Sequence, residues 1–160
     1  MLEQLKELLE MQKALDETLM KEHGLTEYPL GKTKIALFTE LGEMMNELQT
    51  EFKWWKKHAK YDREKALEEY VDCLHFCLSL FNYHQLQIGR WVDYNIEKPY
   101  KIGDEHFSLN GALRWCAFGE ESSLQWLFDI GKYFGFTWKE IYTTYKKKNE
   151  VNYQRLKDNY

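Results

Sequence analysis

The sequence has few prolines, few cysteines and no long apolar run, and each scarcity narrows the class of protein. Two prolines, Pro29 and Pro99, occur in 160 residues, which favours long uninterrupted helices. Every apolar run falls short of the ~18 residues that indicate a membrane-spanning helix. A hydrophobic content of 44 % nevertheless excludes a disordered chain. We therefore expect one globular domain, residues 1–160, with no membrane span.

Cysteines are few, and basic residues are outnumbered by acidic ones. Cys73, Cys77 and Cys116 are an odd number, which argues against a disulfide framework and predicts thiols in the core. No matching Cys or His pair accompanies them, so zinc is not expected. Residues 1–19 carry acids throughout and lack the pattern of a signal peptide, which predicts a cytoplasmic protein. The net charge of −4 offers no general attraction to nucleic acid.

Helical periodicity dominates the rest of the chain. Leucines at helical spacing predict a helix over residues 2–22. Further helices are expected at residues 33 to about 57, 63 to about 86, 109–116, 120–133 and 137–160. No sustained alternation predicts a strand, so the expected fold is an all-α helical bundle. The mixed segment at about 89–119 is a candidate functional insert, because loops of that length are often functional.

The segment ELGEMMNELQTEFKWWKK, residues 40–57, combines acids with an apolar face. Glu40, Glu43 and Glu47 stand at i, i+3 and i+7, on the border of that face. The apolar face itself, which includes Phe38 and Phe52, is expected to be buried. On a single helix, such acids are most often a solvated surface.

The helix expected at 63–86 favours a different interpretation. Apolar residues surround most of it, a pattern typical of a helix buried on nearly every side. Its remaining narrow stripe carries the polar residues Glu68, Glu69, Asp72, His75 and Ser79. Ionised acids inside a core are costly unless cations or a metal compensate them, so this stripe needs a partner.

Two pairs of acids, Glu40 with Glu43 and Glu69 with Asp72, can meet between these helices. Four clustered carboxylates repel one another, and Mg²⁺, which prefers oxygen ligands, would relieve that repulsion. The alternative is a buried ion-pair network with lysines.

Mg²⁺ commonly shares its coordination shell with substrate phosphates, so phosphate-binding cations are expected nearby. Lys56 lies beside the tryptophans Trp54 and Trp55. On the last helix, Lys148, Asn152 and Arg155 share one face, although cations there could equally complement the helix dipole.

Gln12 and Asp16 lie on the leucine stripe of the first helix, where polar groups need hydrogen-bond partners. An amide beside a carboxylate could read the edge of a flat heterocycle, and Trp54 or Trp55 could cover its face. Hydrogen bonds between helices would explain the same pair without a ligand.

Together these residues resemble the dimeric all-α dUTPases, relatives of the MazG-type nucleotide pyrophosphohydrolases. The superfamily motif E-x-x-E followed by E-x-x-D matches Glu40, Glu43, Glu69 and Asp72. The segments ELLEMQKALD, FKWWKK and YKKKNEVNYQR resemble the substrate-reading helix, the Trp and Lys segment and the C-terminal motif of the dUTPase branch. At the C-terminal motif, Leu156 follows Arg155 where the family pattern has glutamine.

The resemblance implies hydrolysis of dUTP, and of dUDP, with Mg²⁺ as cofactor. Its metal ligands would be Glu40, Glu43, Glu69 and Asp72, with Glu43 also orienting or deprotonating the attacking water. Phosphate charge would be neutralised by Lys56, Lys148 and Arg155. The contacts to uracil or deoxyribose would come from Gln12, Asp16, Trp54 or Trp55, His75 and Asn152.

The resemblance also implies a homodimer in the cytosol of a bacterium or a phage-infected cell. Small phage-type relatives can bind a transcriptional repressor, for which the insert at about 89–119 is the candidate surface. Three alternatives stay open at this point. They are a promiscuous MazG-like pyrophosphohydrolase, a helical binding module with structural acids, and a di-iron carboxylate bundle, which would require a second Glu-x-x-His motif.

Overall fold

The computed structural model describes residues 1–84, 102–103, 108–120 and 122–158. In chain order its elements are α1 (Leu2–Glu22), α2 (Leu30–Glu47), the 3₁₀ turn η1 (Gln49–Glu51), α3 (Arg63–Tyr83), α5 (Leu109–Ala117), α6 (Ser123–Tyr133) and α7 (Trp138–Lys157). Within these ranges there is no strand, and one isolated bridge joins Leu48 to Tyr61. The predicted all-α fold is confirmed. Most of the predicted insert at about 89–119 lies outside the described residues.

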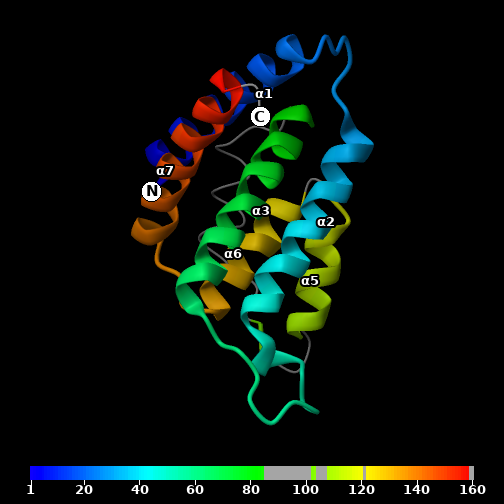
Figure 1. The fold of residues 1–160 in the computed structure, drawn as a ribbon, viewed down its shortest axis with the longest axis vertical. Helices are drawn as coiled ribbons and strands as arrows, with labels where there is room; N and C mark the ends of the chain where they lie inside the picture. Colours follow the sequence, from blue (N-terminus) through cyan, green and yellow to red (C-terminus); the bar gives the residue numbers. More distant parts are fainter. Residues whose placement is uncertain (85–101, 104–107, 121, 159–160) are drawn as a thin grey trace.

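Helix α3 is the centre of the bundle, with α1, α2, α6 and α7 packed around it (Figure 1). The prediction that this helix is buried on nearly every side is confirmed, because its apolar side chains from Ala66 to Phe81 form the middle of the core. All three cysteines are free and buried, as predicted for core thiols. In the part of the chain that the structure describes, no helix is long and apolar enough to cross a membrane.

Local hydrogen bonds set the beginnings of several helices. The side chain of Asp62 accepts from the backbone N–H of Lys65 and caps α3. Thr137 and Glu140 form a reciprocal capping box at the start of α7. Glu140 also receives both guanidinium nitrogens of Arg63, at 2.8 and 3.1 Å, which ties the start of α7 to the start of α3.

The expected helix over residues 33–57 is wrong at both ends. Helix α2 begins at Leu30, directly after Pro29, and ends at Glu47. Beyond it, Leu48 is fully buried and pairs with Tyr61, while the Glu47 carbonyl accepts from the backbone N–H of Asp62. Because these long-range contacts turn the chain back toward α3, the FKWWKK segment is a loop rather than helix.

The expected burial of Phe38 and Phe52 is also wrong. Phe38 is 68 % exposed and Phe52 is 41 % exposed. Leu37, Leu41 and Met44 are the α2 residues that pack into the core. Phe38 lies on the flank of that stripe, and Phe52 follows the end of the helix, so a helical wheel continued through residue 52 assigned both wrongly.

Candidate active site

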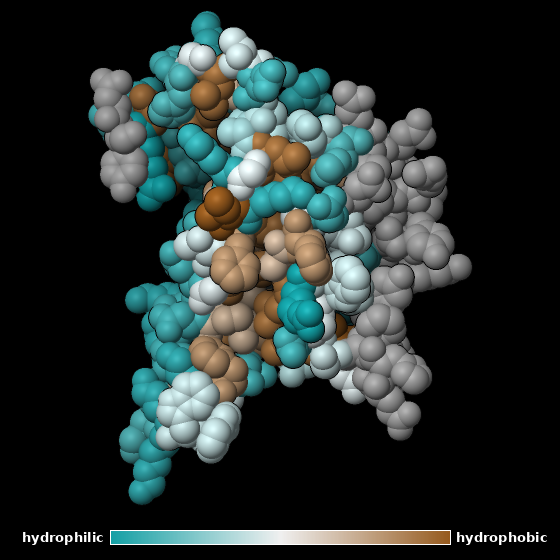
Figure 2. All heavy atoms as spheres, turned by 90° about the vertical axis from the view of Figure 1, so that its right-hand side faces the viewer, coloured by the Kyte–Doolittle hydropathy of each residue, from teal (hydrophilic) through white to brown (hydrophobic). Residues whose placement is uncertain are grey.

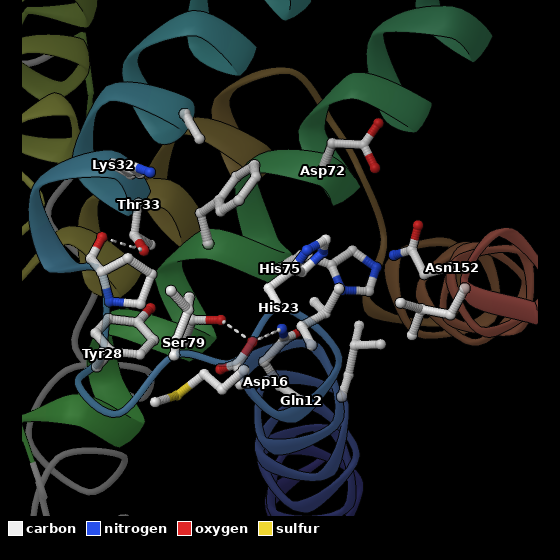
Figure 3. A pocket seen from close by; sticks show the side chains of 18 of the residues that line it. Gln12, Asp16, His23, Tyr28, Lys32, Thr33, Asp72, His75, Ser79 and Asn152 are labelled. Atoms are coloured by element: carbon white, nitrogen blue, oxygen red, sulfur yellow. Dashed lines mark hydrogen bonds between the residues drawn. The ribbon is translucent and has the colours of Figure 1, made fainter. Parts of the chain in front are cut away.

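A cavity of about 530 Å³ opens between α1, α2, α3 and α7 (Figure 3). Each of the four helices contributes polar side chains to its wall, and the connection between α1 and α2 closes one side. The polar residues along the wall are Gln12, Asp16, His23, Tyr28, Lys32, Thr33, Glu40, Asp72, His75, Ser79, Asn152 and Arg155. Most of the predicted site residues therefore meet at one place.

Three of the four predicted metal ligands form a cluster at the α2–α3 interface. Glu40, Glu43 and Glu69 each offer a carboxylate oxygen, and these atoms lie within 4.8 Å of one another. Burial, together with the neighbouring charges of Asp72, Glu43 and Glu69, raises the pKa of Glu40 to about 7. Burial likewise raises the pKa of Glu69. These effects indicate carboxylates whose repulsion is not fully compensated, a donor set that fits a hard divalent cation.

Glu47, the third acid of the predicted series, is separate from this cluster and forms an ion pair with Lys60. Asp72 and Lys148 form another ion pair, which joins α3 to α7 beside the acids. Within the described ranges, no lysine or arginine forms an ion pair with Glu40, Glu43 or Glu69. An ion pair therefore accounts for Asp72, whereas within these ranges the other three acids have no direct ion pair, and Lys148 offsets the charge of Glu40 and Glu69 only in part.

The predicted polar pair on α1 forms hydrogen bonds across three helices. The Gln12 amide donates to Asp16 Oδ1 at 2.8 Å, and its Oε1 accepts from the Tyr145 hydroxyl at 2.7 Å. Ser79 donates to the same Asp16 oxygen at 2.9 Å. Both ends of the Gln12 amide therefore have a hydrogen-bond partner, one on α1 itself and one on α7. Gln12 is thereby fixed in place and positions Asp16 at the cavity wall (Figure 3).

His75 is buried against this network. Its Nδ1 lies 2.7 Å from Gln12 Oε1, and its ring stacks on Tyr145 with centroids 4.2 Å apart. Since an amide oxygen can only accept, Nδ1 carries the proton and Nε2 is left as an acceptor. Burial, aided by the charge of Lys148, lowers the pKa of His75 to about 3, so the ring is neutral at physiological pH. Its Nε2 is buried, with no hydrogen-bond partner in the described structure.

The tryptophan and lysine segment lies away from this cavity. Trp54 is 90 % exposed and Trp55 is 63 % exposed, and neither lines the cavity. Lys56 donates to Gln49 at 2.9 Å and lines a separate shallow hollow with Trp54. Contact of these three residues with a nucleotide remains a prediction.

Several wall residues were not identified from the sequence, namely His23, Tyr28, Lys32 and Thr33. They belong to the connection after α1 and to the first turn of α2. That stretch has no periodicity to assign its side chains to a face. Tyr145 on α7 is fully buried, and its hydroxyl also extends the polar network.

Comparison with protein-family models matches residues 4–160 to the dUTPase family. No curated protein matches the chain. The matched region includes the helices described above, except the first two residues of α1, and also the acid cluster and the network around Asp16. Because the match spans nearly the entire sequence and the fold is all-helical, the chain belongs to the dUTPase family and is a dUTP diphosphatase.

Proposed function

We propose that this enzyme hydrolyses dUTP, and also dUDP, to dUMP in a reaction that depends on Mg²⁺. The observation that carries the proposal is the cluster of Glu40, Glu43 and Glu69 near one end of a cavity whose other end has a fixed hydrogen-bonding network. A nucleotide has its chemical groups in the matching order, with metal-binding phosphates at one end and a heterocycle with hydrogen-bonding edges at the other.

The proposed Mg²⁺ ligands are Glu40, Glu43 and Glu69, together with Asp72. A bound divalent cation polarises phosphoryl oxygens and lowers the pKa of water. Glu43, the exposed member of the cluster, is proposed to orient the attacking water and accept its proton. Lys148 and Arg155 are proposed to offset phosphate charge. Lys148 is already at the cluster through its pair with Asp72, and Arg155 lines the cavity.

Asp16, His75 and Asn152 are proposed to contact the uracil or the deoxyribose. Asp16 and His75 present acceptors, and each is held by a hydrogen bond between α1 and α3. Asn152 lines the cavity from α7, and α7 also supplies Lys148. A neutral His75 suits this role, because an uncharged ring can accept a hydrogen bond from a ligand N–H or O–H.

The test is release of pyrophosphate from dUTP, dCTP, dTTP and UTP, each with Mg²⁺ and with EDTA. We expect turnover confined largely to dUTP and abolished by EDTA. Phosphate release from dUDP tests the second substrate in the same way. Comparable rates with all four triphosphates would instead indicate a promiscuous MazG-like enzyme. Full activity in EDTA would contradict the proposal that the reaction depends on a metal bound at the carboxylate cluster.

We also propose that the enzyme is a homodimer, formed through the face of α2 and α5. Large, exposed apolar residues lie on α2 and at the C-terminal end of α5, and the two helices are neighbours. They are Ile35 and Phe38 on α2, Trp115 on α5 and Phe118 directly after α5. Figure 2, which views this side, shows apolar residues running along the face. A continuous apolar patch of this kind is more typical of an interface than of free surface.

Phe38→Glu is expected to convert the dimer to a monomer, because it places a charge in the middle of that face. Light scattering coupled to size-exclusion chromatography would measure the mass of each species. Val151→Glu, at an exposed apolar position on α7, is the matched control and should leave the mass unchanged. A wild-type protein that elutes as a monomer at all concentrations would contradict the proposal.

Binding of a transcriptional repressor through the segment at about 89–119 also stays a prediction. Most of that segment lies outside the described residues.

A further inference from the structure

Tyr28 has a hydroxyl group that the protein itself leaves unused. It lies in the connection between α1 and α2 and lines the cavity on the side of Asp16 and Ser79 (Figure 3). Its ring is held by stacking on Tyr83, with centroids 5.1 Å apart and 24° between the planes. The hydroxyl oxygen is buried and has no hydrogen-bond partner in the part of the chain that the structure describes. Such groups are rare in folded proteins because a buried polar atom without a partner is costly.

The two side-chain hydroxyls near this group donate their own protons to other acceptors. Thr33 donates to the carbonyl of Pro29 at 3.2 Å, and Ser79 donates to Asp16 at 2.9 Å. Burial raises the pKa of Tyr28 and the charge of Asp16 acts in the same direction, which outweighs the opposing effect of the nearby Thr33 and Ser79 hydroxyls, so the phenol keeps its proton at neutral pH. Tyr28 therefore has a proton to donate, beside a carboxylate that can only accept.

Asp16 supplies the complementary half of a recognition site. Both hydrogen bonds that the described residues make to its carboxylate go to Oδ1, from Gln12 and Ser79. Its position is thus fixed while the second oxygen is left for a ligand. An acceptor beside a donor matches the edge of an imide ring, where an N–H stands next to a carbonyl oxygen. Uracil presents this edge at N3 and its flanking carbonyls.

We propose that the Tyr28 hydroxyl donates a hydrogen bond to a uracil carbonyl oxygen next to N3–H, while Asp16 accepts from N3–H. This assignment rests on the proposed function, since it requires the base to occupy the Asp16 end of the cavity. It adds to the enzyme a substrate-binding residue from outside the helices. N3–H and one flanking carbonyl of the base then gain partners, and the buried phenol gains the acceptor that it lacks in the free protein.

The test compares dUTP with its 2-thio and 4-thio analogues, because sulfur accepts hydrogen bonds more weakly than oxygen. For the wild type we expect one analogue to have kcat/KM about 5- to 10-fold below that of dUTP, mainly through KM. Tyr28→Phe should lower kcat/KM for dUTP by a similar factor and hydrolyse dUTP and that analogue equally well. The affected analogue identifies the carbonyl.

The matched control is Tyr83→Phe, which removes a hydroxyl from the stacked partner that does not line the cavity. It should retain the wild-type preference for oxygen over sulfur. An unchanged preference in Tyr28→Phe would overturn the proposal. If Tyr28→Phe fails to fold, as judged by circular dichroism, equal wild-type rates with oxygen and both sulfur substrates would overturn it equally. Absence of dUTP hydrolysis by the wild type would instead overturn the proposed function, so the two failures are distinguishable.

Discussion

Glu43→Gln is expected to lower kcat for dUTP by about 10²–10⁴-fold, the range associated with loss of a general base. The substitution keeps the size of the side chain and removes both its charge and its basicity. Glu43 is the exposed member of the carboxylate cluster, so the change should leave the fold intact. Pyrophosphate release under saturating dUTP and Mg²⁺ measures kcat, and thermal unfolding in EDTA checks that the variant is folded.

The matched control for that experiment is Glu68→Gln. Glu68 is an exposed glutamate on α3, directly before Glu69, and it is not a member of the cluster. Its replacement changes the net charge by the same amount and should leave kcat within about twofold, because surface substitutions away from a site usually have small effects. If Glu43→Gln retains more than a tenth of the wild-type kcat, Glu43 is not the general base.

Glu40→Gln is expected to stabilise the metal-free protein at pH 8 while reducing its activity. The pKa of Glu40 is about 7 in the folded protein against an ordinary value of 4.5 for a glutamate, so the folded state binds the proton more tightly than the unfolded state. Below pH 4.5 Glu40 is protonated in both states and does not lower the stability. The cost develops as pH rises from 4.5 and is complete above about 7. Glutamine has no charge, so the Glu40→Gln variant does not have this destabilisation at high pH.

The expected gain at pH 8 in EDTA is about 1–2 kcal/mol in the free energy of unfolding, and close to zero at pH 4. This value is less than the full pKa difference would give, because Glu40 is half-buried and solvent screens its charge. Urea denaturation at the two pH values measures the difference. Glu10→Gln, at an exposed position on α1, is the control and should show no such pH dependence. Equal stability of Glu40→Gln and wild type at pH 8 would show that the acid cluster is not repulsive.

The same substitution should also weaken stabilisation by metal. A ligand that binds only the folded state raises stability in proportion to the logarithm of its concentration above Kd. If Glu40 is a Mg²⁺ ligand, added Mg²⁺ should raise the Tm of the wild type more than that of Glu40→Gln. The rise in the wild type should itself diminish as pH falls below about 7, where Glu40 becomes protonated.

Periodicity was sufficient to predict the fold class and the position of the acids. The spacing of Glu40, Glu43, Glu69 and Asp72 depends on local helical geometry, and local geometry follows from sequence alone. The same reasoning placed Asn152 and Arg155 together on α7, and both line the cavity. It failed at the end of α2, where a buried Leu48 pairs with Tyr61 instead of continuing the helix. Contacts between distant residues decided that boundary, and no local propensity could show them.

Local sequence patterns are therefore enough to predict the helices, the burial of α3 and the residue types of the acid cluster. The packing of the helices determines which polar groups form hydrogen bonds with each other and which are available to bind a ligand. Gln12 is held by Tyr145 on α7 and by Asp16 on its own helix, whereas the Tyr28 hydroxyl has no such partner within the described residues. A helical wheel assigns each side chain to a face of its own helix. It cannot show which groups meet across three helices and a connecting loop, because those distances are set by packing.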